Sequence, residues 1–369
     1  MGKRPTTAFI DLDAIRYNYL QLKKQLAEGV NILAVVKADA YGHGAVQAAK
    51  TLEEIGCRYF GVAILEEAVE LRDAGIKSDI LILGGIYNEQ TADVIKYNLT
   101  PVVFDSETVI SLNSAAKGKI KIHVKIDTGM GRLGLLPNQV AGFFKGLKDL
   151  KNIEIEGVLT HLAEIDEDER GFSGGQMDLF LKAIDIIKGM GFDPLFKHIA
   201  NSAATVNLPS THFNLVRPGI MLYGSYPVKI LKKMIDLKPV MRLATRIIQI
   251  KKIPIGHSVS YGRQFVADRE SIIATVPIGY GDGYPRHLSN KGEMLVRGAR
   301  AKVAGVVCMD LTMLDVTDIK DVCEGDEVTV IGRDGGEEIA VEEIAEKAET
   351  IPYEILCGIN KRVPREYKT

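Results

Sequence analysis

The sequence predicts an α/β protein in which a (β/α)8 TIM barrel is followed by a C-terminal, mainly-β domain. Two observations predict the barrel: short β-branched runs alternate with amphipathic helical segments from residue 30 to about 240, and the runs number eight. A third predicts the second domain, because later segments are short, β-rich and separated by Gly, Asp and Pro. The 369 residues also exceed what one core usually organises.

The eight expected strands share a high content of Val, Ile and Leu. They are residues 31–37, 58–63, 79–84, 100–104, 119–127, 154–161, 196–201 and 213–219. Helical segments between them, such as 65–75 and 174–191, end in glycine as a helix C-cap would. An open, doubly wound sheet is the alternative, but no GxGxxG follows the first strand.

The expected domains are a barrel over residues 11–239 and a β domain over residues 240–369. We place the boundary where Pro239 follows the last helical segment of the barrel, since proline cannot continue a helix. Residues 1–10 contain the alternating run TAFID and are a candidate extra strand of the β domain.

Composition excludes several classes of protein. The 46 Lys and Arg residues nearly balance the 48 Asp and Glu residues without long like-charge blocks, so nothing indicates binding to nucleic acid or to an anionic membrane. No signal peptide or membrane span is evident, and we expect a cytoplasmic protein. The four cysteines lie far apart without CxxC spacing, which argues against zinc and disulfides, and we expect buried, reduced thiols.

The first expected strand ends in a lysine. Its apolar run, ILAVV, leads directly into Lys37 and then ADAYGHG and a helical pattern. Catalytic groups of parallel α/β folds collect at the carboxyl ends of strands, although a solvated loop lysine is the ordinary alternative. Gly42 and Gly44 favour a special role, because they permit a close backbone approach to a ligand or a tight turn.

Other strand ends are equally polar, and in a barrel they would converge on one mouth. Taken singly, His161 could be a hydrogen-bonded core histidine and Arg217 a loop cation. The converging residues are Lys37, Tyr41, Lys125, Asp127, Arg132, His161, His198, Asn201, Ser202, Arg217 and Gly219. A metal site is less expected, because the two histidines lack carboxylates at ligand spacing.

Two glycine-rich runs indicate ligand contacts. KIDTGMGRLG, residues 125–134, suits a loop that wraps a ligand, with Arg132 able to grip a carboxylate through its planar guanidinium. RPGIMLYG, residues 217–224, offers a glycine at a helix start, where backbone N–H groups bind phosphate. A strand-end lysine, a phosphate site and a carboxylate-gripping arginine together describe a pyridoxal phosphate enzyme that acts on an amino acid.

Eight motifs along the chain make the resemblance specific. In order, they are VVKADAYGHG, KIDTGMGR, HIANSAA, VRPGIMLYG, VSYGR, PIGYGDGY, CMD and RVPREY. With them the sequence resembles bacterial alanine racemases, pyridoxal phosphate enzymes of fold type III, along nearly its whole length. It departs from the common pattern at Gly281, where alanine is usual, and at Asp39, where asparagine is frequent.

The resemblance implies a place for the cofactor, pyridoxal 5'-phosphate. Lys37 would anchor it and Arg217 would face its ring nitrogen. The phosphate would be held by Tyr41, Ser202, Gly219, Ile220 and Tyr353, with Asn201 beside it and His161 and His198 supporting. Because guanidinium only donates hydrogen bonds, the ring nitrogen should stay unprotonated, which makes a weaker electron sink suited to removing and returning one proton.

The resemblance also implies two bases, one for each face of the substrate. Lys37 would take the proton from D-alanine, and Tyr261 of a partner subunit would take it from L-alanine, supported through His161 by Arg217. Arg132 and the backbone N–H of Met309 would hold the substrate carboxylate. Asp310 and Tyr280 would line the approach.

Further expectations concern modification and assembly. Lys125 and Arg132 would repel each other at one mouth, and the resemblance implies a carbamate on Lys125. A head-to-tail homodimer with shared sites is expected; the alternative is a β domain folded over its own barrel. D-Alanine for peptidoglycan is the implied role.

Three rival functions stay open. A decarboxylase of basic amino acids is disfavoured by Arg132, and a cofactor carrier by the presence of the β domain. Racemases of broader specificity differ in pocket volume, which the sequence leaves open.

Overall fold

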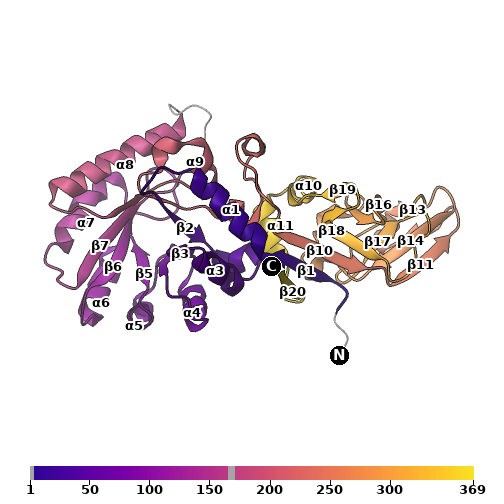
Figure 1. Cartoon of the computed structure of the whole chain (residues 1–369), viewed down its shortest axis with the longest axis horizontal. Helices are drawn as coiled ribbons and strands as arrows, with labels where there is room; N and C mark the ends of the chain where they lie inside the picture. Colours follow the sequence, from indigo (N-terminus) through magenta and orange to yellow (C-terminus); the bar gives the residue numbers. More distant parts are fainter. Residues whose placement is uncertain (1–3, 165–170) are drawn as a thin grey trace.

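The protein consists of a helix-rich lobe and a sheet-rich lobe, side by side in an elongated molecule (Figure 1). The structure is a computed structural model and describes residues 4–164 and 171–369. The helix-rich lobe holds an eight-stranded parallel sheet, and the other lobe is mainly antiparallel sheet. The predicted fold class is therefore confirmed.

The eight barrel strands coincide with the eight predicted runs. Their order in the sheet is β8-β7-β6-β5-β4-β3-β2-β9, and every neighbouring pair is parallel. No ladder joins β8 to β9 in the described part of the chain, so the barrel is nearly closed. The strands are β2 (Asn31–Val35), β3 (Tyr59–Val62), β4 (Asp79–Ile82), β5 (Thr100–Val103), β6 (Ile120–Lys125), β7 (Ile153–Leu159), β8 (Phe196–His198) and β9 (Leu215–Val216).

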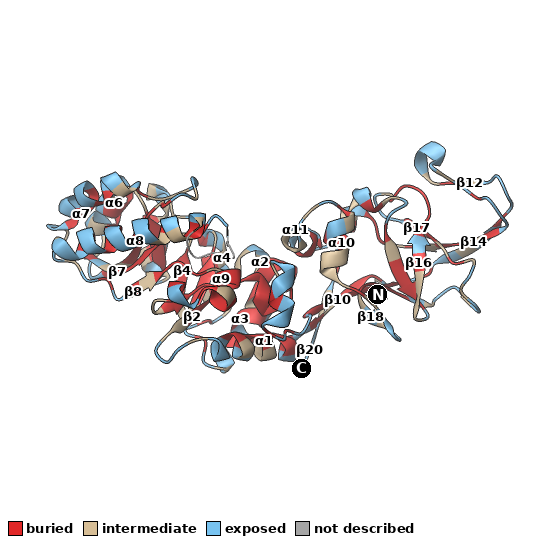
Figure 2. Cartoon of the chain, turned by 90° about the horizontal axis from the view of Figure 1, so that it is seen from above, coloured by how far each residue is buried: buried red, intermediate tan, exposed pale blue. Residues whose placement is uncertain are grey.

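Helices surround these strands and turn their exposed faces outward (Figure 2). Glycines with positive φ, Gly75 at 92° and Gly191 at 90°, follow α4 and α8 as predicted for helix ends. The helices of this lobe are α1 (Leu12–Lys24), α2 (Lys37–Gly42), α3 (Ala45–Glu54), α4 (Leu65–Asp73), α5 (Thr91–Lys96), α6 (Ser106–Ala115), α7 (Val140–Leu147), α8 (Phe172–Gly189) and α9 (Ser202–Asn207).

The second lobe is built on a ten-stranded sheet of order β11-β14-β17-β16-β15-β18-β10-β1-β20, with β19 paired to β18. A separate hairpin joins β12 (Ser258–Val259) to β13 (Phe265–Val266), and two helices, α10 (Val341–Lys347) and α11 (Pro352–Gly358), complete the lobe. The main strands are β1 (Thr7–Asp11), β10 (Met241–Arg246), β11 (Gln249–Ile253), β14 (Ser271–Val276), β15 (Glu293–Val296), β16 (Ala299–Val303), β17 (Thr312–Asp315), β18 (Glu327–Asp334), β19 (Glu337–Ile339) and β20 (Arg365–Lys368).

The first strand of the chain belongs to this second sheet. β1 runs antiparallel to β10 and parallel to β20, and the chain then enters α1 of the barrel lobe. Buried Asn18 of α1 is bonded to the chain just before β10: its amide donates to the carbonyl of Lys238 at 2.8 Å and its side-chain oxygen accepts from the Lys238 N–H at 2.8 Å. Residues 1–3 of the candidate strand 1–10 lie outside the described residues. The division between residues 239 and 240 stays a prediction.

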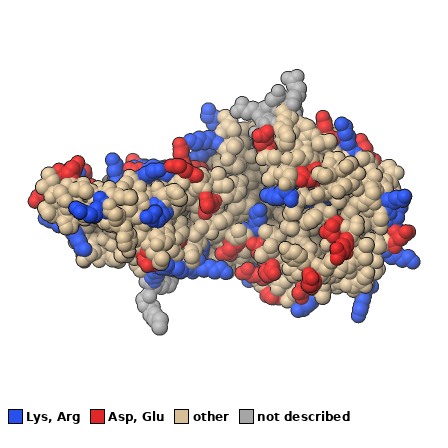
Figure 3. All heavy atoms as spheres, turned by 180° about the vertical axis from the view of Figure 1, so that it is seen from behind, with Lys and Arg blue, Asp and Glu red and all other residues tan. Residues whose placement is uncertain are grey.

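Charged residues of both signs share the surface (Figure 3), and the four cysteines are free thiols. Figure 3 shows Lys and Arg interspersed with Asp and Glu over the face that it presents. Within the described ranges, no helix is both long and apolar enough to cross a membrane. All four thiols are free, but Cys323 and Cys357 are exposed. The expectation of four buried thiols was therefore wrong, because Cys323 lies in a surface turn before β18 and Cys357 in the last turn of the peripheral helix α11.

Candidate active site

A cavity of about 560 Å³ lies at the carboxyl ends of the barrel strands. β2, β6, β7, β8 and β9 each deliver polar residues to it at or just after their last residue, and α11 adds one more from the second lobe. Ten of the predicted residues line it together: Lys37, Tyr41, Lys125, Arg132, His161, Asn201, Ser202, Arg217, Gly219 and Tyr353. Of the eleven residues expected to converge on a barrel mouth, nine line this cavity; Asp127 and His198 do not.

The chain makes an unusual turn directly after Lys37. The four residues Ala38–Tyr41 have φ between 51° and 54°, a left-handed turn built without glycine. Its end is fastened by Asp39, whose carbonyl accepts from the Gly44 N–H at 2.9 Å and whose carboxylate accepts from the Ala45 N–H at 2.8 Å. The turn sends Lys37 and Tyr41 to the same cavity.

Gly42 and Gly44 serve a close approach, but to the chain's own C-terminal segments. A Cβ at Gly42 would lie 2.4 Å from the carbonyl oxygen of Leu356, and one at Gly44 would lie 1.9 Å from the hydroxyl of Tyr367. Arg365 also donates to the Gly42 carbonyl from Nη2 at 3.1 Å. The second lobe thus clamps the turn that carries Lys37 and Tyr41.

Hydroxyl groups gather at one end of the cavity. The Gly219 N–H donates to Ser202 Oγ at 2.8 Å, and a Cβ at Gly219 would lie 2.3 Å from the Tyr41 hydroxyl. The Tyr353 ring centroid lies 5.8 Å from that of Tyr41. Burial raises the pKa of Tyr41 and raises the pKa of Tyr353 to about 12, so both phenols stay protonated and can donate hydrogen bonds.

Asn201 and Ile220 were expected near the phosphate, and each has a specific place in the local backbone structure. Asn201 is the N-cap of α9, because its side-chain oxygen accepts from the Ala203 and Ala204 N–H groups at 3.1 Å each. Buried Ile220 begins a short 3₁₀ turn, Ile220–Tyr223, where the sequence predicted a helix start.

Arg217, which also lines the cavity, anchors a directional chain of hydrogen bonds. Its Nη1 donates to His198 Nδ1 at 3.0 Å, so the hydrogen of the neutral His198 ring lies on Nε2. That Nε2–H then donates to His123 Nδ1 at 2.8 Å. His123 Nε2 then donates to Glu156 Oε2 at 3.2 Å, and Glu156 pairs with Lys121 at 2.6 Å. Guanidinium chemistry thereby fixes the tautomers of both buried histidines.

The cavity is cationic. Its lining includes two lysines and two arginines and, among the described residues, no Asp or Glu. Burial lowers the pKa of Arg217 to about 9, which leaves it charged at neutral pH. Burial and then the Arg217 cation lower the pKa of His161 to about 3, so this imidazole is neutral. Its Nδ1 lies 3.3 Å from Arg217 Nη2. The donor set suits an anionic ligand.

Asp127 was expected at the barrel mouth but does not line the cavity; it shapes the loop beside it. Its carboxylate accepts from the backbone N–H groups of Gly129 at 2.9 Å, Gly131 at 3.0 Å and Arg132 at 3.1 Å. These bonds shape the glycine-rich loop and set Arg132 at the cavity.

Four predicted residues of the second lobe lie away from the cavity of their own chain. Tyr261, Tyr280 and Met309 are 71%, 43% and 53% exposed, and Asp310 is exposed beside them in sequence. Tyr261 lies between β12 and β13, which occupy the end of the lobe far from the barrel (Figures 1 and 2). Within one chain, only Tyr353 reaches the cavity from this lobe among the predicted residues.

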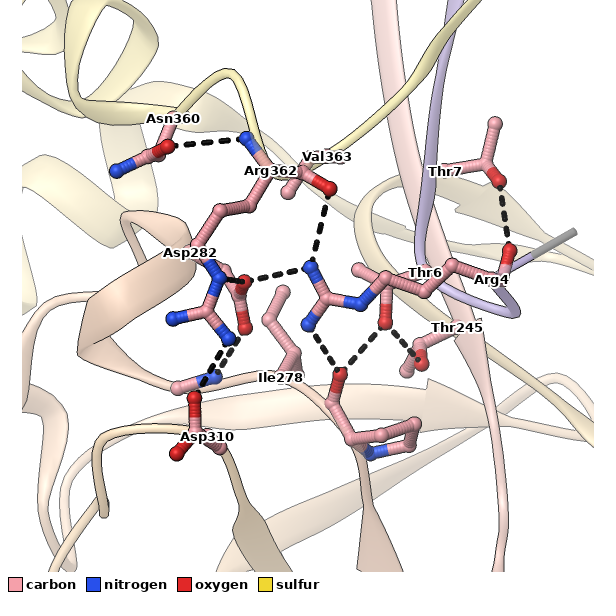
Figure 4. A network of polar contacts seen from close by, with 12 residues as sticks. Arg4, Thr6, Thr7, Thr245, Ile278, Asp282, Asp310, Asn360, Arg362 and Val363 are labelled. Atoms are coloured by element: carbon pink, nitrogen blue, oxygen red, sulfur yellow. Dashed lines mark hydrogen bonds and ion pairs between the residues drawn. The ribbon is translucent and has the colours of Figure 1, made fainter.

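A buried carboxylate organises the backbone that carries Tyr280 and Met309 (Figure 4). Asp282, fully buried, accepts from Arg4 Nη1 at 2.7 Å and from the Gly279 N–H at 3.1 Å. Arg362 lies 3.4 Å from the same carboxylate and donates to Asp310 at 2.6 Å. The Gly281 N–H donates to the Met309 carbonyl at 2.8 Å, which joins the two exposed loops.

Gly281 makes room for this arrangement, and Gly281→Ala should disturb it. The added Cβ would lie 2.5 Å from Arg362 Nη1 and 3.0 Å from the Met309 carbonyl oxygen. We expect Tm to fall by a few degrees, because the guanidinium must move and the loop must shift. Thermal unfolding measures it. In an Arg362→Met background, Gly281→Ala should lower Tm by less. Equal losses of Tm in both backgrounds would show that the contact with Arg362 does not matter.

Fold and site together define a barrel protein with a cationic, amine-bearing cavity at the carboxyl ends of its strands. Residues 10–227 match the family described as alanine racemase, N-terminal domain, and residues 240–367 match alanine racemase, C-terminal domain. The chain therefore belongs to the alanine racemase family and is a racemase of the isomerase class.

Similar proteins span the whole chain. A curated alanine racemase from Halothermothrix orenii is 50% identical and covers 99% of this chain and 97% of its own length. The solved alanine racemase of Clostridium difficile 630 has a TM-score of 0.95 at 39% identity, covering 100% of this chain and 97% of that one. The Bacillus anthracis structure, described with bound L-Ala-P, has a TM-score of 0.94 at 38% identity, covering 100% and 96%.

Two groups of residues escaped the sequence reasoning. The relay partners His123 and Glu156 were missed, although His123 lies two residues before Lys125 and so faces the same side of β6. The left-handed turn was missed because no glycine in Ala38–Tyr41 signals a positive φ.

Proposed function

We propose that this protein racemises L-alanine and D-alanine with pyridoxal 5'-phosphate held in the barrel-mouth cavity. The observation that carries the proposal is the joint placement of Lys37, the hydroxyl cluster and Arg217 in one cationic cavity. The Bacillus anthracis relative with bound L-Ala-P supports alanine as the substrate.

The residues present fit the cofactor. Tyr41, Ser202 and Tyr353 offer hydroxyl donors around the bare backbone of Gly219, where any side chain would collide with Tyr41, and this suits a phosphate. Asn201 and Ile220 would support this end, Lys37 would anchor the aldehyde carbon, and Arg217, oriented by His198, would face the ring nitrogen. The bound cofactor would supply an electron sink for the charge left when the α-proton departs.

Two bases would move the proton. Burial and then the Arg132 cation lower the pKa of Lys37, which brings its amine closer to a base at neutral pH. Lys37 would act on the face from which D-alanine loses its proton, and Tyr261 of the partner subunit on the L-alanine face. His161, neutral between Arg217 and the cavity, would support that tyrosine.

The remaining substrate contacts come from both lobes. Arg132, set by the Asp127 loop, would grip the substrate carboxylate together with the backbone N–H of Met309. Asp310 and Tyr280 would line the approach. Because Met309, Asp310, Tyr261 and Tyr280 are exposed and absent from the cavity of their own chain, we propose a head-to-tail homodimer in which each second lobe completes the partner's site.

A visible spectrum, borohydride reduction with peptide mapping, and a chiral assay with L-alanine test the proposal. We expect an absorption band at about 420 nm, reduced cofactor on Lys37 and the appearance of D-alanine. L-Serine and L-lysine run in parallel measure specificity, and release of CO2 from L-lysine would instead indicate the decarboxylase. No band and no label on Lys37 would remove the cofactor from the proposal. The supply of D-alanine to peptidoglycan and the cytoplasmic location stay predictions.

We also expect a carbamate on Lys125. Burial and then Arg132 lower its pKa to about 8, so a neutral amine is available to attack CO2, forming a C–N bond and releasing a proton. Its occupancy should rise as pH rises through about 8, because deprotonation produces the nucleophile. Carbon-13 NMR in labelled bicarbonate measures it, with Lys125→Ala as the control. A resonance that persists in that variant, or none in the wild type, would contradict the expectation.

A further inference from the structure

We propose that Glu67 is a positioning residue for Lys37, holding the left-handed turn that begins immediately after that lysine. This inference rests on the proposed function, in which Lys37 anchors the cofactor and serves as a base. Glu67 lies on α4, outside the residues that line the cavity.

The two oxygens of this carboxylate have separate partners. Oε2 accepts from the Ala63 N–H at 2.7 Å and from the Ile64 N–H at 3.4 Å, which caps the start of α4. Oε1 crosses to the neighbouring βα unit and accepts from the Ala38 N–H at 2.6 Å. One side chain therefore joins the end of β3 to the residue that follows Lys37.

The turn needs such a bond at its beginning. L-Residues disfavour positive φ, and four consecutive residues adopt it here, so the surrounding structure must hold them. The far end of the turn is held by Asp39 and by Arg365 from the second lobe. At the near end, the bond from Glu67 fixes the peptide unit shared with Lys37.

Glu67 also balances the charges around Lys37. The cations Arg132 and Lys125 face the amine from the glycine-rich loop and from β6, and the thiol of Cys357 faces it from α11. Burial and Arg132 lower the pKa of Lys37, whereas the Glu67 carboxylate raises it. Its hydrogen bond thus acts on the backbone next to Lys37, and its charge acts on the amine of that lysine.

Glu67→Gln should keep the cap of α4 but remove the hydrogen bond to Ala38. Glutamine can still cap α4 through its carbonyl oxygen, because Glu and Gln both serve at this helix position. Its amide NH2 would then face the Ala38 N–H, so the crossing bond is lost together with the charge. Glu66→Gln removes a charge from the exposed neighbouring position and is the matched control.

Four measurements on purified protein test the proposal. Reconstitution of apoenzyme with pyridoxal phosphate should weaken at least about tenfold in Glu67→Gln, since a hydrogen bond to a charged acceptor is lost. The pH midpoint for borohydride trapping of cofactor on Lys37 should shift downward, because the carboxylate that raises its pKa is gone. kcat should fall more than KM changes, and thermal unfolding should stay near that of Glu66→Gln.

Two further substitutions at position 67 test whether the carboxylate can be replaced. Glu67→Asp keeps the charge and should recover part of the shift in trapping midpoint; Glu67→Ala should lose both the cap and the bond. Equal midpoints and equal reconstitution in Glu67→Gln and Glu66→Gln, with Lys37 labelled in both, would overturn this inference alone. No label on wild-type Lys37 would overturn the proposed function and this inference with it.

Discussion

Lys37→Ala is expected to lower kcat/KM for alanine at least about a thousandfold in both directions. The amine would be lost both as the anchor of the cofactor and as the base on one face of the substrate, and general base catalysis alone contributes about 10² to 10⁴. A chiral assay started from each enantiomer measures the loss. Peptide mapping after borohydride reduction should find no label at position 37.

Lys50→Ala is the control for this substitution, because it removes an exposed lysine from α3. It should racemise and take up the label as the wild type does. Near-wild-type activity in Lys37→Ala, or label on another lysine, would remove Lys37 from its proposed role.

Tyr261→Phe should separate proton removal from inversion. We expect racemisation to fall about a thousandfold, because the second face loses its base while Lys37 keeps the first. In deuterated water, NMR should still show exchange of the α-proton of D-alanine without formation of L-alanine. Tyr87→Phe, which alters an exposed tyrosine of the barrel lobe, should behave as wild type. Equal loss of exchange and inversion would argue against two bases.

Mixing the two inactive variants tests the shared site. If Tyr261 of one chain serves Lys37 of another, random exchange of equal amounts of Lys37→Ala and Tyr261→Phe chains yields mixed dimers with one intact site each. About a quarter of wild-type activity should then return. A site completed within one chain would give no recovery.

The barrel could be predicted because its signal repeats. Eight buried, β-branched runs separated by helical segments allow few arrangements, and the carboxyl ends of parallel strands place Lys37, Lys125 and Arg217 at one mouth by topology alone. The chemistry of the cavity followed from residue types at strand ends.

What the sequence could not predict depends on contacts between distant segments. The left-handed turn exists because Glu67 and Arg365 hold it, and neither is near it in the chain. Gly42 and Gly44 were expected to serve a ligand or a tight turn; their close contacts are to the chain's own C-terminal segments, which only the assembled lobes bring near them. The exposure of Tyr261 at the far end of its lobe likewise depends on the assembled fold.

The position of β1 between β10 and β20 has a consequence for synthesis and for motion. The polypeptide passes between the lobes twice, once after β1 and once before β10, so two covalent connections restrict the rotation of one lobe against the other. During synthesis β1 is made before the barrel strands, whereas its two partners in the sheet, β10 and β20, are made after them. All eight barrel strands are therefore made before the sheet around β1 can be completed.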